Sequence, residues 1–427
     1  MDKLLIFFIV ILIVLALRVP IYISLAVSSM ILGILALNDA YTPFAIQKMF
    51  SGVNNFTLLA IPLFMLTGEL MNGGGLSERL LDFANCLVGW IHGGLGFVCV
   101  VTCCFLAAIL GSSSACAAMV GAILVPTMVK RGYEKNFSGA VVAASGCVGP
   151  IIPPSSSAII YAVAAEQSVS KLFVGGYVPG LMIGVVFCVY IYIQAKRKGF
   201  PAEPKPTLKL IVSSFKSAIV PLLLPIIIMG GILSGKFTAT ESACVAVLYC
   251  MIVACFIYRT IKIRELPAII LKAAKGSCVV LAVMMTANFL GYILTLSQIP
   301  QTAAAAIRAM TDSRVLFLLM VNVILIIAGM FLDAASAIVI LTPVFLPALA
   351  IYGVDPIFFG VMMTVNLMIG VLTPPVGLNL YVVSSVAKLD IMELAKEAIP
   401  FMIMLVLIVL FMVLFPGFVT FLPNMVG

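Results

Sequence analysis

Long apolar stretches follow one another along the whole chain and are separated by short polar segments. A helix needs about 20 apolar residues to cross the hydrocarbon core of a bilayer. Eight stretches read as simple membrane-spanning helices, at 4–17, 20–37, 57–72, 172–194, 218–235, 239–258, 277–298 and 398–422. The segment Ser77–Val88 carries three charged residues and is predicted to lie as an amphipathic arm along the membrane surface. The pattern therefore predicts an all-α polytopic membrane protein.

Two further apolar runs are interrupted at their middle by small polar residues. The run 94–129 is broken at Gly111-Ser112-Ser113-Ser114, and the run 315–350 is broken at Asp333-Ala334-Ala335-Ser336. Each half has only about 14–18 residues, which is marginal for crossing a bilayer. Each run is therefore predicted to form a re-entrant hairpin.

Two other runs are interrupted by glycine and proline. The run 137–165 contains the sequence GPIIPP at 149–154, and the run 356–386 contains GVLTPP at 370–375. Consecutive prolines remove backbone donors and cannot continue a helix. Both runs are predicted to be broken helices, and the predicted architecture has about 11 spans in addition to the two hairpins.

The chain also repeats itself. At an offset of 221 residues without gaps, six glycines and prolines of the window 126–154 fall on glycines and prolines of 347–375. The two windows hold eight and seven such residues, so chance would match only about two. The hairpin and the broken helix of each half therefore correspond to each other.

The charged residues set the predicted topology. Six Lys and Arg lie within 196–216 and five within 259–275, and two predicted spans separate these loops. Both loops therefore lie on one face, which the positive-inside rule makes cytoplasmic. The first hairpin then opens from the cytoplasm and the second from outside. The predicted organisation is a first inverted repeat at 1–195, a basic cytoplasmic linker at 196–216 and a second inverted repeat at 217–427.

Composition excludes several classes of protein. Of the 427 residues, 63% are hydrophobic and 9% are charged, whereas soluble domains average about 45–50% apolar and about 25% charged. A His-based metal site or a Ser-His-Asp triad would need the single histidine, His92. No base lies beside a serine, which disfavours an intramembrane hydrolase. The chain is thus not expected to be an enzyme.

Inverted repeats with discontinuous helices are typical of secondary transporters. A helix broken in lipid leaves backbone groups unpaired at a cost of several kcal/mol each. A bound cation can use the carbonyls and hydroxyls as ligands, while helix N-termini face an anionic substrate group. Paired closed sites of this kind suit alternating access better than a passive channel.

Two cation sites are predicted, one in each half. The predicted ion is Na⁺, because every ligand offered is a hard oxygen. The first would use Ser112, Ser113, Ser114, Gly149 and Pro150. The second would use Asp333, Ala334, Ser336, Gly370 and Thr373. Close helix packing by these small residues is the alternative explanation.

The substrate is predicted to lie between the two sites. Its candidate contacts are Ser155, Ser156, Ser157, Gly377 and Asn379, with Ser145 and Asn366, which correspond under the 221 shift. Interhelical hydrogen bonding explains these polar residues equally well. Two carboxylates, Glu69 and Glu241, lie near predicted span ends, where a scaffold role is favoured over transport.

Five stretches resemble the large membrane subunit of the tripartite ATP-independent periplasmic (TRAP) transporters. They are LLAIPLFMLTGELMNGGGLSERLLDFA (58–84), GSSSACAAMVGAILVP (111–126), GPIIPPS (149–155), FTATESACVAVLY (237–249) and GVLTPPVGLNLYV (370–382). The chain departs from the family at 155–157, where it reads Ser-Ser-Ser and the family often has Ser-Ile-Pro.

The resemblance implies Na⁺-coupled import of carboxylate-bearing solutes, such as four-carbon dicarboxylates or sialic acids, across the bacterial inner membrane. It also implies a small four-span membrane subunit and a periplasmic substrate-binding protein as partners, and an elevator motion of the hairpins and broken helices. The chain resembles the unfused form of the large subunit. A stand-alone Na⁺/anion symporter of related hairpin architecture remains the alternative.

Overall fold

The computed structural model describes residues 9–11, 13–14, 17, 19–37 and 42–426. The predicted first span, 4–17, lies mostly outside the described residues, and Arg18 after it lies wholly outside them. In the part of the chain that is described, the regular structure is helical and contains no β-strand. The predicted all-α class is therefore confirmed.

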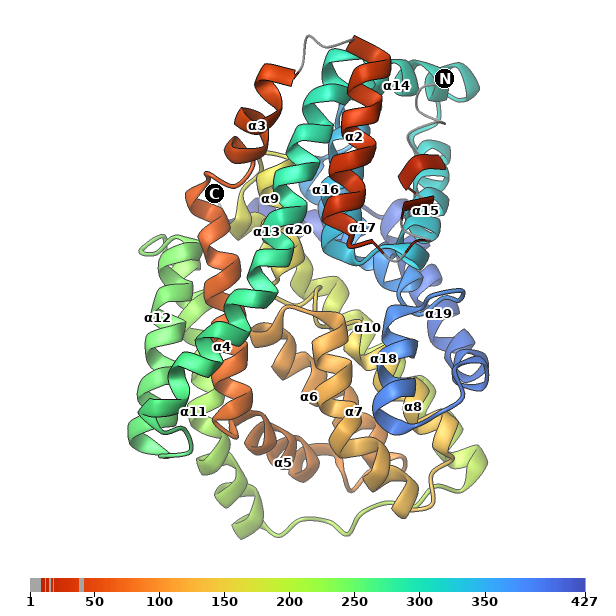
Figure 1. The fold of residues 1–427 in the computed structure, drawn as a ribbon. Helices are drawn as coiled ribbons and strands as arrows, with labels where there is room; N and C mark the ends of the chain where they lie inside the picture. Colours follow the sequence, from red (N-terminus) through yellow and green to blue (C-terminus); the bar gives the residue numbers. More distant parts are fainter. Residues whose placement is uncertain (1–8, 12, 15–16, 18, 38–41, 427) are drawn as a thin grey trace.

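The helices follow the chain in the order shown in Figure 1. The first half contains α2 (Ile21–Leu37), α3 (Thr42–Ser51), η2 (Phe56–Leu59), α4 (Ala60–Gly73), α5 (Leu76–Val88), α6 (Gly94–Leu110), α7 (Ser113–Lys130), α8 (Lys135–Gly146), α9 (Ser156–Ala164) and α10 (Val169–Lys198). The second half contains α11 (Leu208–Leu233), α12 (Ala239–Ile252), η3 (Val253–Ile257), η4 (Ile263–Glu265), α13 (Leu266–Leu296), α14 (Ile299–Met310), α15 (Arg314–Phe331), α16 (Ala334–Ile351), α17 (Pro356–Gly370), α18 (Leu378–Ala387), α19 (Ile391–Leu414) and α20 (Gly417–Met425).

Among the described residues, nine helical segments are long and apolar enough to cross a membrane. Apolar side chains remain exposed on their outer faces: Val185, Ile226 and Leu407 are 63%, 64% and 58% exposed. Such a surface is stable in lipid, where apolar side chains need no burial.

Several helices extend past the predicted span boundaries into the predicted cytoplasmic region. The predicted linker 196–216 is shorter, because α10 continues to Lys198 and α11 begins at Leu208. Likewise α13 begins at Leu266, whereas its span was predicted to begin at 277. Lys and Arg end the apolar run but are good helix formers, so charge ends the hydrophobic stretch without ending the helix.

The stretch 398–422, predicted to be one span, is not a single helix. It divides into α19, which ends at Leu414, and α20, which begins at Gly417. Pro416 lies at the junction, where its ring and missing N–H prevent α19 from continuing.

Helix pairs separated by a short break lie over the ranges predicted for the hairpins and the broken helices. The hairpin helices α7 and α16 begin at Ser113 and Ala334 and end at Lys130 and Ile351, so both ends differ by the 221-residue offset. In Figure 1 the first hairpin extends downward from the centre of the molecule and the second extends upward. The two hairpins thus extend in opposite directions, and their orientation relative to a membrane stays a prediction.

The broken helices pass through the centre of the molecule. In α8 every residue from 137 to 146 is buried, and in α17 every residue from 357 to 370 is buried. Each then breaks at its glycine and proline segment and continues as α9 or α18. The Pro153–Pro154 and Pro374–Pro375 peptide bonds are both cis.

Three amphipathic segments accompany the spans. The predicted arm Ser77–Val88 is present as α5, where Arg79 Nη1 donates to Ser217 Oγ at 2.8 Å and its guanidinium lies over the Tyr258 ring. The helix α14 was not predicted, although it lies 221 residues after most of α5. A third short helix, α3, was also missed because its stretch is too polar to read as a span.

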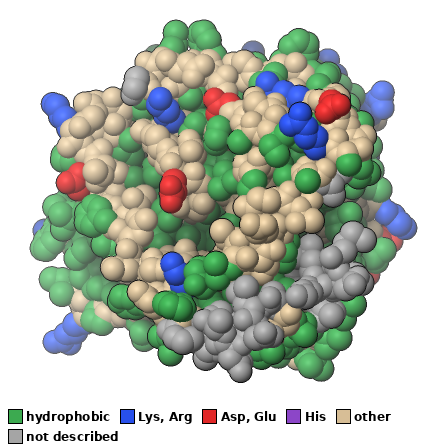
Figure 2. All heavy atoms as spheres, turned by 90° about the horizontal axis from the view of Figure 1, so that it is seen from above, with side chains coloured by type: hydrophobic (Ala, Val, Ile, Leu, Met, Phe, Trp, Pro, Cys, Tyr) green, Lys and Arg blue, Asp and Glu red, His purple; other side chains and the backbone are tan. Residues whose placement is uncertain are grey.

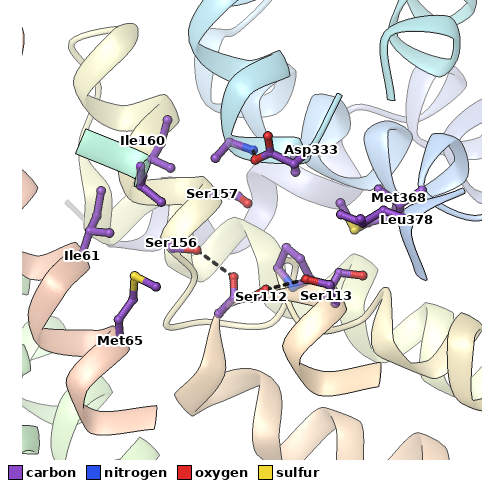
Figure 3. Close-up of a pocket in the computed structure, with 17 residues that line it drawn as sticks. Ile61, Met65, Ser112, Ser113, Ser156, Ser157, Ile160, Asp333, Met368 and Leu378 are labelled. Atoms are coloured by element: carbon purple, nitrogen blue, oxygen red, sulfur yellow. Dashed lines mark hydrogen bonds between the residues drawn. The ribbon is translucent and has the colours of Figure 1, made fainter. Parts of the chain in front are cut away.

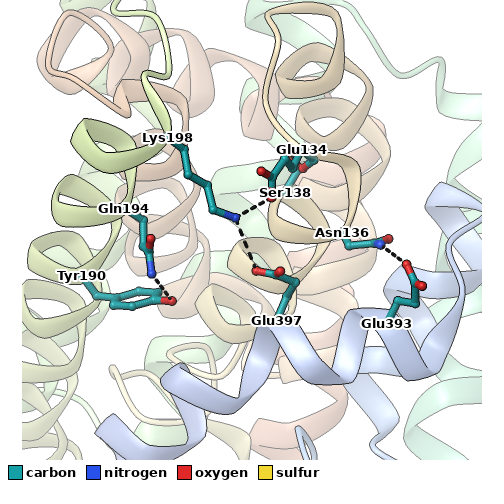
Figure 4. A network of polar contacts seen from close by, with 8 residues as sticks. All are labelled: Glu134, Asn136, Ser138, Tyr190, Gln194, Lys198, Glu393 and Glu397. Atoms are coloured by element: carbon teal, nitrogen blue, oxygen red, sulfur yellow. Dashed lines mark hydrogen bonds and ion pairs between the residues drawn. The ribbon is translucent and has the colours of Figure 1, made fainter.

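A polar network joins the two halves at the lower end of the molecule (Figure 4). Lys198 of α10 pairs with Glu134, which precedes α8, and its Nζ lies 4.0 Å from Glu397 of α19. Asn136 Nδ2 of α8 donates to Glu393 Oε2 of α19 at 2.7 Å. These contacts hold α8, α10 and α19 in one body at the predicted cytoplasmic end.

The opposite end of the molecule is drawn in Figure 2. Side chains of both charge signs lie there among apolar and other side chains. This is the predicted extracellular end, where the positive-inside rule expects no strong excess of Lys and Arg.

Candidate functional site

A cavity of about 160 Å³ lies where the two hairpin tips meet (Figure 3). Its lining combines the first tip, the second tip and both broken helices with two helices outside them, α4 and α13. The predicted site residues that line it are Ser112, Ser113, Ser114, Pro150, Ser156, Ser157, Asp333 and Ala334. Residues of both predicted ion sites and of the predicted substrate site therefore share one cavity.

Four helices begin at this cavity. The lining includes Ser112 and Asp333, the N-cap residues of α7 and α16. It also includes Ser156 and Leu378, the first residues of α9 and α18. The N-terminus of a helix carries unpaired N–H groups and about half a positive charge. The cavity thus offers an anion four such termini without a Lys or Arg among its lining residues.

Four helices also end beside the same cavity, and their carbonyl groups supply the opposite charge. Gly111 and Leu332 follow α6 and α15, while Pro150 and Val371 lie after α8 and α17. Two of these carbonyls have side-chain donors: Ser156 Oγ donates to Gly111 O at 2.7 Å, and Ser155 Oγ donates to Pro150 O. The breaks thus place carbonyl oxygens and N–H groups side by side.

The first tip is bonded to other parts of the molecule. Ser112 Oγ caps α7 by accepting from Ala115 N at 3.4 Å and lies 3.3 Å from Ser114 Oγ. Asn379, from α18, donates through Nδ2 to Ser113 Oγ at 2.5 Å and to Ala143 O at 2.9 Å. A residue of the second half therefore completes the first tip.

The amide of Asn379 also offers a free oxygen. The side chain is fully buried, and its Oδ1 atom has no hydrogen-bond partner among the described residues. A buried polar atom without a partner costs about 1–3 kcal/mol. A cation bound at the first tip would remove this cost, so the donor set fits Na⁺ there.

The second tip contains the one ionisable side chain among the residues that line the cavity, Asp333. Its carboxylate accepts from Ala335 N at 3.1 Å, from Ser336 N at 3.3 Å and from Ser336 Oγ at 2.5 Å. All three bonds lie within the first turn of α16, where an acidic cap is favourable.

One glycine in each broken helix lets that helix approach a hairpin closely. A Cβ atom on Gly370 would lie 2.3 Å from the carbonyl carbon of Gly329 in α15. A Cβ atom on Gly149 would lie 3.3 Å from Ser112 O in the first tip. Each glycine therefore packs against a hairpin, although neither lines the cavity.

Several predicted contacts lie off the cavity. Ser145 Oγ donates to Val141 O at 2.7 Å, and Asn366 Nδ2 donates to Asn322 Oδ1 at 2.6 Å. Thr373 Oγ1 in the second break donates to Ile369 O near the end of α17 at 2.7 Å. Gly377 is the left-handed N-cap of α18 at φ 55°. None of these four residues lines the cavity in this structure.

The sequence predictions missed the apolar walls. These are Ile61 and Met65 of α4, Ile160 of α9, Val280 of α13, and Met368, Val371 and Leu378 around the second break. Apolar residues facing a cavity look the same in sequence as apolar residues facing lipid, so only the fold separates them.

The two carboxylates near span ends lie away from the cavity. Glu69 of α4 pairs with Lys272 of α13, with Oε2 and Nζ 2.7 Å apart. Glu241 forms a capping box with Thr238 at the start of α12. Both contacts fit the favoured scaffold role.

Comparison with known proteins places the chain in a family. A family model described as the DctM component of the tripartite ATP-independent periplasmic transporters matches residues 8–418. The C4-dicarboxylate TRAP transporter large permease protein DctM of Pseudomonas aeruginosa is 41% identical over 404 residues, which cover 95% of this chain and 94% of the relative. The sialic acid TRAP transporter large permease protein SiaM of Vibrio cholerae is 36% identical over 388 residues, 91% of each chain.

A solved structure shares the fold. The YdaH transporter of Alcanivorax borkumensis aligns with a TM-score of 0.67 and 15% identity, covering 93% of this chain and 97% of that one. The relatives are transporter permeases, so the expectation of a non-enzyme in the inner membrane agrees with them. The chain belongs to the DctM component family, the large permease subunits of tripartite ATP-independent periplasmic transporters.

Proposed function

We propose that this chain imports a carboxylate-bearing solute of the sialic acid or four-carbon dicarboxylate class by coupling its transport to Na⁺. In this proposal the central cavity holds the solute between an ion at each hairpin tip. The convergence of four helix N-termini on one cavity carries the proposal, because it recognises an anion without a basic side chain.

The choice of Na⁺ follows from the atoms at the tips. Serine hydroxyls, backbone carbonyls, the Asp333 carboxylate and the free Oδ1 of Asn379 are all hard oxygen donors. One carboxylate among neutral oxygens suits a monovalent cation better than a divalent one. Bound cations would also offset the negative charge of the solute.

The proposed partners are a small four-span membrane subunit and a periplasmic protein that delivers the solute. The family is named for a tripartite assembly, and the relatives in Pseudomonas aeruginosa and Vibrio cholerae are named large permease proteins of such transporters. The hairpins and broken helices would move together as an elevator past α4 and α13. Asn379 of α18 bonds Ser113 of the first hairpin and Ala143 of α8, which supports their movement as one body.

The test is solute uptake into proteoliposomes that contain this chain and the small subunit, with the binding protein added outside. Labelled sialic acid and a labelled four-carbon dicarboxylate are each offered under an inward Na⁺ gradient and under a matched K⁺ gradient. We expect uptake of one solute only with Na⁺ and only with the binding protein present. Equal uptake in Na⁺ and K⁺ would contradict the proposed coupling.

Omitting the binding protein distinguishes the alternative. A stand-alone Na⁺/anion symporter would transport its solute through the purified chain alone, and the Na⁺ requirement would remain. Full uptake without the binding protein would therefore support that alternative.

A further inference from the structure

An apolar groove of about 610 Å³ lies on the outer face of the molecule between α6 and α10. It extends from Ile91 and Tyr192 at one end to Phe105 and Leu181 at the other. The Tyr192 hydroxyl is the one side-chain oxygen or nitrogen among the groove's lining residues. The groove is separate from the central cavity, with which it shares no lining residue.

The length of the groove along α10 matches the thickness of one membrane leaflet. Leu181 and Tyr192 are eleven residues apart along α10, which at a rise of about 1.5 Å per residue is about 16 Å. Half of a hydrocarbon core about 30 Å thick is about 15 Å. Tyr192 lies near the basic end of α10, so the groove spans the predicted cytoplasmic leaflet.

A glycine opens the floor of the groove. A Cβ atom on Gly184 would make ordinary contacts, 3.5 Å from Cys104 Sγ and 3.6 Å from Val100 Cγ1. A side chain longer than one carbon at Gly184 would project from this floor into the groove.

Aromatic residues and lysines surround the cytoplasmic end. Lys196 Nζ lies 4.7 Å from the centroid of the Tyr192 ring, and Lys205 Nζ lies 5.6 Å from the centroid of the Trp90 ring. The nearby carboxylate of Glu203 is paired with Arg131 at 3.1 Å. Positive charge therefore remains at the level where lipid head groups lie, beside aromatic rings that favour this interface.

We propose that the groove binds one acyl chain of an anionic phospholipid of the cytoplasmic leaflet, with its phosphate held by Lys196 and Lys205. The apolar lining and the leaflet depth match an acyl chain, and the two lysines select a negative head group. A lysine near an anionic lipid surface contributes about fivefold in binding.

The single tryptophan of the chain, Trp90, can report on occupancy because it precedes Ile91 in the groove wall. The full chain is reconstituted in vesicles in which phosphatidylglycerol or phosphatidylcholine has bromine in the upper part of its acyl chains. Bromine quenches tryptophan fluorescence at short range. We expect brominated phosphatidylglycerol to bind at least about fivefold more tightly than brominated phosphatidylcholine.

Two variants separate the head-group contact from the acyl contact. Lys196→Gln combined with Lys205→Gln should make the two lipids equal within about twofold, whereas Lys209→Gln in the same cytoplasmic region should keep the preference. Gly184→Leu should reduce quenching by both lipids. Gly230→Leu is its control, because Gly230 of α11 faces open space.

Native mass spectrometry provides a second measurement that does not depend on Trp90. One more phosphatidylglycerol should remain bound to the unmodified chain than to Gly184→Leu. Equal quenching by both brominated lipids would overturn the head-group assignment. Loss of quenching when the small membrane subunit is added would instead identify the groove as a helix-docking surface and overturn the proposal.

Discussion

The two hairpin tips occupy equivalent positions in the chain but differ in charge and in anchoring. Ser112 and Asp333 are 221 residues apart, and each is the N-cap of the second helix of its hairpin. Ser112 is neutral and its tip is bonded to Ser156 and Asn379 of other helices. Asp333 is ionisable and its side-chain bonds lie within its own helix turn.

This difference shows how one architecture can place two unlike sets of candidate ion ligands at equivalent positions. A neutral tip needs oxygens brought from elsewhere, and Asn379 brings an amide across the boundary between the halves. A charged tip attracts a cation directly and needs fewer fixed partners. We therefore expect the second site to depend on one residue and the first to depend on several.

The largest effect is expected from Asp333→Asn. Asparagine preserves the N-cap of α16 but removes the formal charge. Losing the charged partner of a bound ion costs about 3 kcal/mol, so the half-saturating Na⁺ concentration should rise about 100-fold. Uptake into proteoliposomes measured against Na⁺ concentration tests this.

Asp355→Asn is the matched control, because Asp355 caps α17 in the same way and does not line the cavity. Its Na⁺ dependence should be unchanged. A similar loss in both variants would mean that capping, and not charge, explains the effect at Asp333.

The next effect concerns how closely each broken helix approaches its hairpin. Gly370→Ala would place a methyl group 2.3 Å from the Gly329 backbone, so the free energy of unfolding should fall by about 1–3 kcal/mol. Gly149→Ala meets its neighbours at 3.1 Å or more, so its loss should stay below about 1 kcal/mol. Thermal unfolding in detergent, followed by Trp90 fluorescence, measures both.

Gly230→Ala provides the baseline for these two variants. Gly230 faces open space within α11, and alanine raises helix propensity there by up to about 1 kcal/mol. Equal destabilisation by Gly370→Ala and Gly149→Ala would contradict the proposed difference in packing between the two breaks.

The variant Asn379→Ala tests whether a residue of the second half completes the first tip. Asn379→Ala removes the bonds to Ser113 and Ala143 together with the free Oδ1. We expect the half-saturating Na⁺ concentration to rise about tenfold. Asn366→Ala is the control, because Asn366 is an equally buried amide that bonds Asn322 away from the cavity.

The Asn366 variant should lower thermal stability and leave the Na⁺ dependence unchanged. If Asn366→Ala altered Na⁺ dependence as much as Asn379→Ala, the assignment of Asn379 to the first tip would be wrong.

The breaks, the hairpins and their tips were predictable because glycine, proline and serine change the backbone locally. The 221-residue shift could also have predicted α14, because it places α5 on residues 297–309. The alanine-rich stretch there, however, gives only a weak amphipathic pattern. Helix ends at the predicted cytoplasmic side were not predictable, because lysines such as Lys198 end the hydrophobic stretch without ending the helix.

The partners of the site residues were not predictable. Asn379 and Ser113 are 266 residues apart, and nothing in either segment specifies that the halves meet there. Met65 and Val280 line the cavity from helices that otherwise read as ordinary spans. Such contacts depend on how whole helices pack, and apolar sequence alone does not encode which face turns inward.

The smallest effect is expected from Ser112→Ala, the neutral counterpart of the Asp333 variant. The cap bond that Ser112 accepts is long at 3.4 Å, and Ser114 offers a second hydroxyl 3.3 Å away. Losing one of several neutral ligands should cost at most about 1 kcal/mol, or about fivefold in half-saturating Na⁺ concentration. Combining Ser112→Ala with Ser114→Ala should exceed the product of the single effects if the two hydroxyls replace each other at the ion. An effect of Ser112→Ala as large as that of Asp333→Asn would show that formal charge does not distinguish the two tips.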